Sequence, residues 1–405
     1  MQKDSFSSPL FVRVFVNLLP KSNWKIIKQN NMRFVVSSSQ LSARLQTIGR
    51  VIVSKNSLPI LDSFLFQIRD GKLSLTASDN ETSITTWMEL VECESDITFA
   101  VNAKTIQDAM KEIPEQPLEF YVNNDNLEIT VVYKNGRYNF MGQVADEYPQ
   151  ASALPEECGT LTLASQTLYQ GINRTLFATA DDTLRPVMNG ICFDMTANSL
   201  TIVASDGRKL ACDTLANAQI SQAGTFILQK KPAALVKNIL AKDHGDVTIR
   251  YSERNAVITS ELYSLNCRLI EGRYPNYNSV IPQDNPYQVT VNREAFQSAL
   301  RRVQIFTTAS TSLVKIQLEA SKMTISTQDI DFSMSAEEVL LCDYSEMPMS
   351  IGFPGSSLME VLNNVDGEDV MIKLSDPSRA GVIYPVEQSE NESVLMLLMP
   401  MMLND

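Results

Sequence analysis

The stretch Leu61–Asp79, LDSFLFQIRDGKLSLTASD, contains two runs of alternating apolar and polar residues around a glycine-containing turn. Such period-two alternation predicts a β-hairpin. Two further stretches have the same design, VMNGICFDMTANSLTIVASD at 187–206 and SLVKIQLEASKMTISTQD at 312–329. Each of the three ends in an aspartate, at spacings of 127 and 123 positions: Asp79, Asp206 and Asp329. We therefore expect one structural unit to occur three times in the chain.

Other landmarks repeat at nearly the same spacing. A short strand, a polar cap and a helical apolar pattern precede each hairpin, with matching positions at Leu41, Leu168 and Phe296. A strand and a second short helix follow each hairpin, with matching strand positions at Val101, Leu228 and Phe353. Each copy closes on a proline, at Pro149, Pro275 and Pro400. This order predicts an α+β fold with antiparallel sheet and two short helices on one side of each domain.

The expected domains follow from these landmarks. Residues 1–31 are interpreted as an extension that is disordered or comes from a misassigned start, because the regular pattern begins at Met32. The three repeats are then expected at 32–153, 154–284 and 285–405.

Composition is that of a soluble globular protein, with 44% hydrophobic and 20% charged residues. The six cysteines are scattered singly, without a CxxC pair, which is typical of reduced thiols in a cytoplasmic protein. No apolar run reaches the ~18 residues that a membrane span needs. We therefore expect a cytoplasmic protein without a membrane partner.

Catalytic motifs are missing from the sequence. It has no Gly-rich phosphate loop, no GxSxG elbow and no HExxH, and its single histidine, His244, lies in a turn sequence. The repeated aspartates could form a carboxylate site of a hydrolase or metal enzyme. Turn formation is the favoured interpretation, because Asx side chains bond the local backbone and each repeat has only one such residue. We expect no enzyme activity, no metal and no cofactor.

Positive charge is concentrated in the predicted helices, although the whole chain has a formal charge of −13. Charged helix faces are often merely solvated. Segregation of this kind also suits a polyanion that is held on one side of the protein and repelled elsewhere. Contacts with nucleic acid would then go to phosphates and would not read sequence. The positions expected to face DNA are Arg44, Arg50, Lys55, Lys104, Arg174, Lys230, Lys231, Lys237, Arg301 and Arg302.

Four motifs resemble, in order and spacing, those of the bacterial β sliding clamp family, the processivity subunit of the replicative DNA polymerase. They are SLPILDSFLFQIRDGKLSLTASD, ASDGRKLA, RLIEGRYPNYNSVIP and the terminal LLMPMML, and the resemblance extends from Met32 to Leu403. It implies a head-to-tail homodimer that closes a ring around double-stranded DNA. Helices would line the central hole and sheets would form the rim. The replicative polymerase, the clamp loader and other clamp-motif proteins would be the partners.

The resemblance also implies two further sites. A peptide-binding pocket between the second and third domains would be lined by Met188, Ser205, Gly207, Arg208, Leu210, Pro275, Ser279, Val280, Leu397, Leu398, Met399, Pro400 and Met401. The dimer interface would pair Tyr138 and Phe140 of domain one with Ile305 and Phe306 of domain three. A monomeric adaptor that binds peptides without touching DNA is the alternative, and a measured oligomer size would separate the two.

Overall fold

The computed structural model describes residues 31–403, except for 57, 217, 219, 221, 308–311 and 330–332. The expected extension therefore lies outside the described residues, apart from Asn31, which begins the first strand. The described chain forms two compact units. The first contains the residues up to Pro155 together with Asn255–Arg268, and the second contains Glu156–Arg254 and the residues from Leu269 onward.

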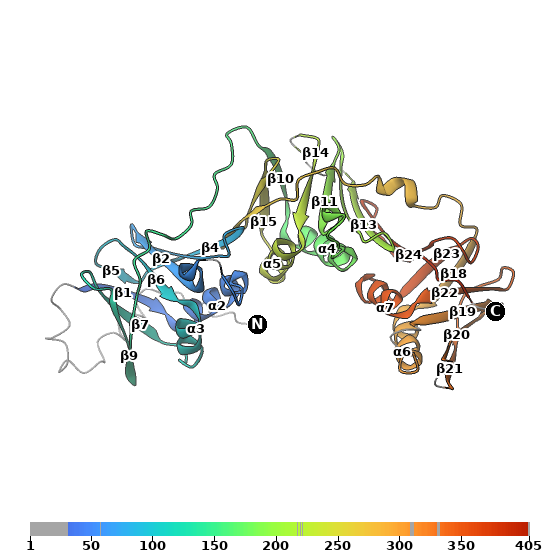
Figure 1. Cartoon of the computed structure of the whole chain (residues 1–405), viewed down its shortest axis with the longest axis horizontal. Helices are drawn as coiled ribbons and strands as arrows, with labels where there is room; N and C mark the ends of the chain where they lie inside the picture. The colour runs from blue at the N-terminus through green and yellow to red at the C-terminus, as the bar shows by residue number, and fades with distance from the viewer. Residues whose placement is uncertain are drawn as a thin grey trace, which may run out of the picture. The chain divides into compact units, whose positions relative to one another are not determined.

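The first unit contains two sets of antiparallel strands (Figure 1). One sheet has the order β5 (Glu92–Cys93), β1 (Asn31–Ser37), β7 (Pro117–Asn123), β8 (Glu128–Tyr133) and β9 (Gly136–Met141). The other set has the order β16 (Asn255–Thr259), β17 (Tyr263–Arg268), β4 (Thr82–Glu89), β3 (Lys72–Ser78), β2 (Ser63–Arg69) and β6 (Ile97–Asn102). The hairpin predicted at 61–79 is β2 and β3, preceded by the 3₁₀ helix η3 (Pro59–Asp62).

One hairpin of the first unit comes from far along the chain. β17 pairs with β4, and Thr86 Oγ1 donates a 2.8 Å hydrogen bond to the carbonyl of Leu262. The Arg44 guanidinium lies 5.2 Å from the centre of the Tyr263 ring and donates to its hydroxyl at 3.1 Å. The hairpin β16–β17 thus belongs to the core of this unit, although it lies within the second sequence repeat.

The second unit is built around one large antiparallel sheet. Its order is β14 (Gly224–Gln229), β11 (Gly190–Met195), β12 (Ser199–Ser205), β13 (Lys209–Ala216), β25 (Glu392–Leu398), β24 (Gly381–Pro385), β23 (Asp369–Leu374) and β18 (Tyr287–Asn292). A smaller sheet has the order β21 (Met334–Leu341), β20 (Lys322–Asp329), β19 (Leu313–Glu319) and β22 (Met349–Pro354). β10 (Gly159–Ala164) pairs with β15 (Asp246–Tyr251).

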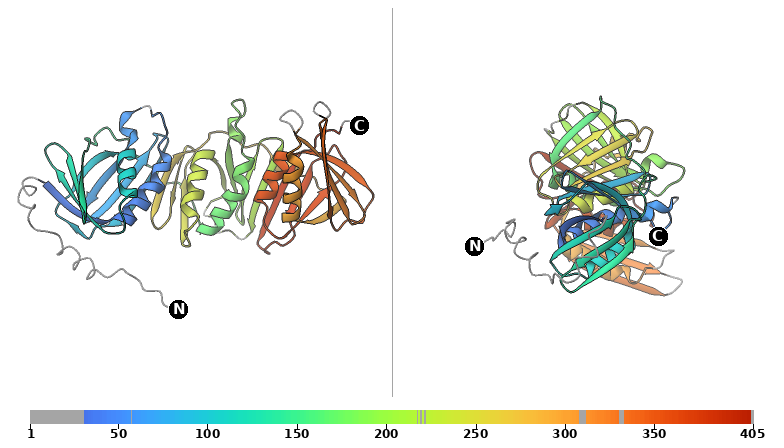
Figure 2. Two further views of the ribbon diagram at one scale, coloured as in Figure 1. Left: turned by 90° about the horizontal axis from the view of Figure 1, so that it is seen from below. Right: turned by 90° about the vertical axis from the view of Figure 1, so that its left-hand side faces the viewer.

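Helices occur in pairs, as the repeats predict (Figures 1 and 2). The pairs are α2 (Ser38–Ile48) with α3 (Ala103–Lys111), α4 (Ser165–Thr175) with α5 (Lys230–Leu240), and α6 (Arg293–Gln304) with α7 (Gly355–Asn364). Asn102 and Asn292 cap α3 and α6, each accepting a 3.0 Å bond from a first-turn amide. The equivalent positions Leu41, Leu168 and Phe296 are fully buried. The threefold repeat of the sequence is therefore confirmed as three tandem α+β domains.

None of the helices in the described part of the chain has the length and apolar character needed to cross a membrane.

Candidate functional site

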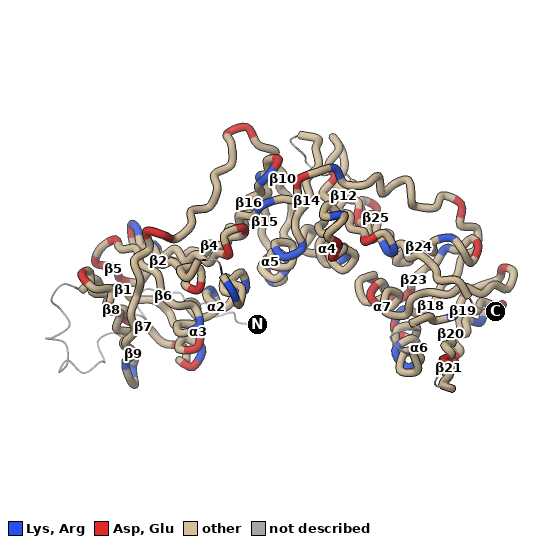
Figure 3. The backbone as a smooth tube through the Cα atoms, in the orientation of Figure 1, with Lys and Arg blue, Asp and Glu red and all other residues tan. Residues whose placement is uncertain are grey.

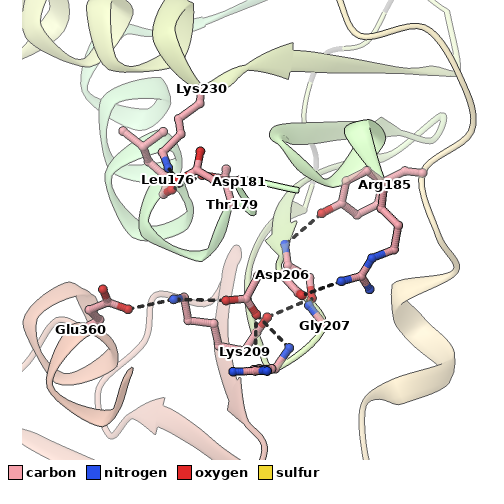
Figure 4. A network of polar contacts seen from close by, with 12 residues as sticks. Leu176, Thr179, Asp181, Arg185, Asp206, Gly207, Lys209, Lys230 and Glu360 are labelled. Atoms are coloured by element: carbon pink, nitrogen blue, oxygen red, sulfur yellow. Dashed lines mark hydrogen bonds and ion pairs between the residues drawn. The ribbon is translucent and has the colours of Figure 1, made fainter. Parts of the chain in front are cut away.

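The turn between β12 and β13 is shaped by Asp206. Its Oδ1 accepts hydrogen bonds from the amides of Arg208 and Lys209, both at 2.8 Å (Figure 4). Gly207 has a φ of +87°, a conformation that L side chains rarely adopt. Asp79 makes the same turn in the first repeat, accepting from Glu81 and Thr82 at 3.0 and 2.7 Å. The turn role predicted for these two aspartates is confirmed.

The C-terminal tail runs directly past this turn. β25 pairs with β13, which sets Leu397 opposite Leu210 and Leu398 opposite Lys209. The Met399 amide then donates a 2.8 Å bond to the carbonyl of Arg208. Leu397 and Leu398 are buried, whereas Met399 remains 40% exposed. The partly exposed Met399 thus directly follows two buried leucines, and its flexible thioether suits adaptable apolar contacts.

The tail continues from the central domain to the third domain. The Met401 amide donates a 2.8 Å bond to the carbonyl of Gly352 in β22, and Met401 is 37% exposed. A Cβ on Gly352 would lie 2.9 Å from both the Met401 carbonyl oxygen and Leu403 Cδ2, so this close approach requires glycine. Met402, the next residue of the tail, is 75% exposed.

The connector GRYPNY is fixed by its two tyrosines. The Tyr274 hydroxyl accepts a 2.9 Å bond from the Ser205 amide, and the Tyr277 hydroxyl donates a 2.8 Å bond to Asp194 Oδ2. Burial raises the pKa of Tyr274, so the phenol stays neutral. Both rings pack against the cluster of Cys192, Val203, Leu210, Cys212, Ala380 and Leu397. The proline that follows Tyr274 is thereby held beside the β12–β13 turn.

A short 3₁₀ helix, η5 (Pro186–Met188), connects the turn to the connector. Arg185, just before it, donates a 3.4 Å bond to the Asp206 carbonyl, and Val187 contacts Gly272. Met188 itself is 5% exposed.

The predicted pocket residues are thus partly assembled. Contacts join the β12–β13 turn, β13, β25, the tail and η5. The predicted residues that lie in these elements are Met188, Ser205, Gly207, Arg208, Leu210, Leu397, Leu398, Met399, Pro400 and Met401. Pro275 is placed by Tyr274. Ser279 and Val280 are exposed in η6 (Tyr277–Val280), where Ser279 bonds the carbonyl of Asn276, so their role stays a prediction.

Sequence reasoning missed Lys209. Its Nζ lies 3.2 Å from Asp206 Oδ2 and 2.8 Å from Glu360 Oε2 on α7, and its side chain is only 12% exposed (Figure 4). Burial lowers the pKa of Lys209, but the bonds to Glu360 and Asp206 outweigh it and raise the pKa overall. The only local signal for the role of Lys209 was Asp206, three residues before it. Its other partner, Glu360, is 151 residues away and left no local pattern.

Most of the predicted DNA-facing cations belong to the helix pairs or to the segment that follows α2, and Figure 3 marks Lys and Arg along the backbone in blue. Six are exposed, namely Arg50, Lys55, Lys104, Lys230, Arg301 and Arg302. Three are half-buried, namely Arg44, Lys231 and Lys237. Lys230 forms a 2.7 Å ion pair with Asp181, and Arg302 pairs with Glu338. Such exposed pairs stabilise the fold little and leave the cations near solvent.

Arg174 does not fit the predicted DNA-facing role. Its side chain is only 8% exposed, and it is surrounded by the carboxylates of Asp213, Asp366 and Glu392. A guanidinium that is buried and bonded in this way cannot also reach a phosphate, so the expectation for Arg174 was wrong.

Two of the strands at the ends of the described sheets carry exposed apolar side chains. β9 ends the order β5-β1-β7-β8-β9, and β21 ends the order β21-β20-β19-β22. Tyr138 and Phe140 lie half-buried on β9, with Met141 59% exposed beside them. In the second unit, Val339 and Leu341 of β21 are 53% and 87% exposed. Ile305 and Phe306, after α6, are 74% and 40% exposed. Exposed apolar edge strands of this kind are templates for pairing with another chain.

Within the part of the chain that the structure describes, no group of three or more His, Cys, Asp or Glu side chains could hold a metal ion. All six cysteines are free thiols. Burial raises the pKa of Cys192 and Cys267 to about 12, which disfavours the reactive thiolate.

Comparison with known proteins gives consistent matches along the chain. Family models of the DNA polymerase III beta subunit match residues 32–152 (N-terminal domain), 162–276 (central domain) and 278–402 (C-terminal domain). Beta sliding clamps of Pseudomonas putida and Escherichia coli K12 are 26% identical over 375 and 374 residues. These alignments cover 92% of this chain and 100% of each relative.

Solved structures show the same likeness. A sliding clamp from Bartonella birtlesii bound to griselimycin is 25% identical, with a TM-score of 0.85. A DNA polymerase sliding clamp from Pseudomonas aeruginosa with ligand is 23% identical, with a TM-score of 0.84. Both comparisons cover 92% of this chain and 100% of the other.

Proposed function

The chain belongs to the DNA polymerase III beta subunit family and is a DNA sliding clamp, and on that premise we propose that two copies close a ring around duplex DNA. The ring tethers the replicative polymerase for processive synthesis and catalyses no reaction. It works in the cytoplasm, with the DNA that it encloses.

The observation that carries the proposal is the placement of exposed cations on the helix pairs of a chain with a formal charge of −13. Cations on these helices attract phosphates, while the excess of acids over the rest of the chain repels them. Attraction of this kind is weak, screened by salt and independent of sequence, so DNA can slide past it. Enclosure, rather than tight contact, then keeps the protein on DNA.

Ring closure is assigned to the edges of β9 and β21. β9 of one copy pairs with β21 of the other, which covers the outer edges of these two strands at once. Tyr138 and Phe140 on the first strand then pack against Ile305 and Phe306 beside the second. The contact is heterologous, so it forms twice in a closed dimer.

Partners bind where the tail crosses from the central to the third domain. Met399 and Met401 are partly exposed and follow the buried Leu397 and Leu398, and the Met399 amide bonds the Arg208 carbonyl of the turn. A short extended peptide with apolar anchors, of the type Gln-Leu-x-Leu-Phe, fits this chemistry. Polymerase, clamp loader and other clamp-binding proteins would present such a peptide.

Native mass spectrometry tests the ring directly. A dimer at micromolar concentration is the expected result. A monomer at all concentrations would instead favour an adaptor that binds peptides without enclosing DNA.

A further inference from the structure

Arg174, in the last turn of α4, connects three distant elements of the second unit. Its Nη1 donates to Asp213 Oδ2 on β13 at 2.8 Å and to Glu392 Oε1 on β25 at 2.6 Å. Its Nε donates to Asp366 Oδ2, two residues after α7, at 2.7 Å. Residues of the central and C-terminal domains therefore share a single guanidinium, whose planar set of donors can serve several carboxylates.

The cluster has more negative than positive charge. The charged groups that face Asp213 are Arg174 on α4, Asp366 beyond α7 and Glu392 on β25. Asp213 is 1% exposed, and its second oxygen, Oδ1, is buried without a hydrogen-bond partner among the described residues. A well-packed cluster of apolar side chains in this place would stabilise the fold as much as the buried ion pairs of Arg174 do. Stability alone therefore does not explain why charged groups are buried here. Fixing one register between elements is the best-attested use of buried ionic groups.

The elements that Arg174 holds are those that position the tail. Glu392 begins β25, and the same strand leads through Leu398 to Met399. Asp366 follows α7, which begins directly after β22, the strand whose Gly352 accepts the bond from Met401. The ion pair between Lys209 and Glu360 is a second contact between β13 and α7 (Figure 4). Displacement of α7 relative to β13 would therefore move the two anchor points of the tail apart.

We propose that Arg174 is a positioning residue of the peptide site, which holds β25 and α7 in the one register that places Met399 and Met401 together. The proposal rests on the proposed function, because it assumes that peptides bind at the tail. Arg174 touches no peptide itself and acts through Glu392 and Asp366.

The test measures affinity for a fluorescein-labelled Gln-Leu-Ser-Leu-Phe peptide by fluorescence anisotropy, with the full-length protein well below its melting temperature. Arg174→Met is expected to weaken binding about tenfold, equivalent to ~1.4 kcal/mol. Arg174→Lys keeps the charge but reaches fewer carboxylates, and its affinity should be intermediate. Arg254→Met is the matched control, because it breaks an exposed 3.4 Å ion pair with Glu271. Its affinity should equal that of the wild type.

A second variant separates positioning from loss of stability. The triple variant Arg174→Met, Asp213→Asn, Glu392→Gln removes three of the cluster's charges, so it should fold even if Arg174→Met does not. It is still expected to bind peptide about tenfold more weakly than the wild type. Hydrogen exchange gives an independent readout. The amides of Met399 and Met401 should exchange faster in this variant, while those of β11 and β12 stay protected.

The outcomes are distinct. If the wild type does not bind the peptide, the proposed peptide function fails, whatever Arg174 does. If the wild type binds and the folded triple variant binds equally well, with unchanged exchange at Met399 and Met401, the positioning role of Arg174 is overturned.

Discussion

The amide of Met401 donates a 2.8 Å hydrogen bond to the carbonyl of Gly352, so the C-terminal tail extends the edge of β22. Gly352→Val tests this contact, because a Cβ there would lie 2.7 Å from Leu313 Cδ1 and 2.9 Å from the Met401 carbonyl oxygen. We expect the tail to be displaced and the Gln-Leu-Ser-Leu-Phe peptide to bind at least tenfold more weakly, a cost of ~1.4 kcal/mol or more. The dimer should persist in native mass spectra. Unchanged peptide affinity would show that the tail does not need this strand.

The exposed methionines should supply the contact with the peptide. Met399→Ala combined with Met401→Ala removes both thioethers but keeps the backbone bonds to Arg208 and Gly352. Peptide binding should be lost in an anisotropy titration, since a single buried anchor can contribute ~2 kcal/mol. Met347→Ala, at a methionine that is 72% exposed, is the matched control and should bind normally. Retained binding in the double variant would place the peptide site elsewhere.

Charge at the proposed ring contact should open the dimer. Ile305→Arg with Phe306→Arg places two cations where apolar side chains are 74% and 40% exposed. Burial of unpaired charge is costly, so native mass spectra should shift from dimer to monomer at micromolar concentration. Leu58→Arg, at another exposed leucine (44%), should leave the dimer intact. A dimer that survives both arginines would contradict the assigned interface.

Asp213 should make the stability of the fold depend on pH. Burial, opposed only in part by Arg174, raises the pKa of Asp213 from its ordinary value of 3.8 to about 6. The folded state therefore binds a proton more tightly than the unfolded state, so this group's contribution to stability falls as pH rises from about 4 to 6. Between pH 7 and pH 5 the wild type should gain about 1 kcal/mol relative to Asp213→Asn.

Urea unfolding of both proteins at the two pH values measures this difference. Asparagine can still accept the bond from Arg174, so the comparison isolates the titration. Parallel changes in the two proteins would mean that Asp213 is not protonated in this range.

The sequence was informative wherever the signal was local. Alternation and turn residues correctly predicted the hairpin at 61–79, and the turn role of Asp206 followed from its neighbours. The spacing of Leu41, Leu168 and Phe296 correctly predicted three equivalent buried helix positions.

Long-range partners could not be predicted in this way. Arg174 was taken for a surface cation because its partners are 39, 192 and 218 residues away, and nothing on its own helix shows that it is buried. Lys209 was missed for the same reason, since Glu360 lies on a helix of another repeat. No local pattern indicated that β17 pairs with β4. A basic residue in a helix sequence shows only that a cation is present. Whether that side chain is buried depends on elements from later in the chain that pack against the helix.

The central claim, that the protein encloses DNA without gripping it, is tested most directly by retention on a closed circle. The protein is loaded by its host's clamp loader onto a nicked plasmid, separated from free protein by gel filtration at 0.5 M salt, and then measured before and after the plasmid is cut once. Screening at such salt removes most phosphate attraction. The expected result is stable retention on the circle and rapid loss after linearisation. Equal loss from circular and linear DNA, or equal retention on both, would contradict enclosure.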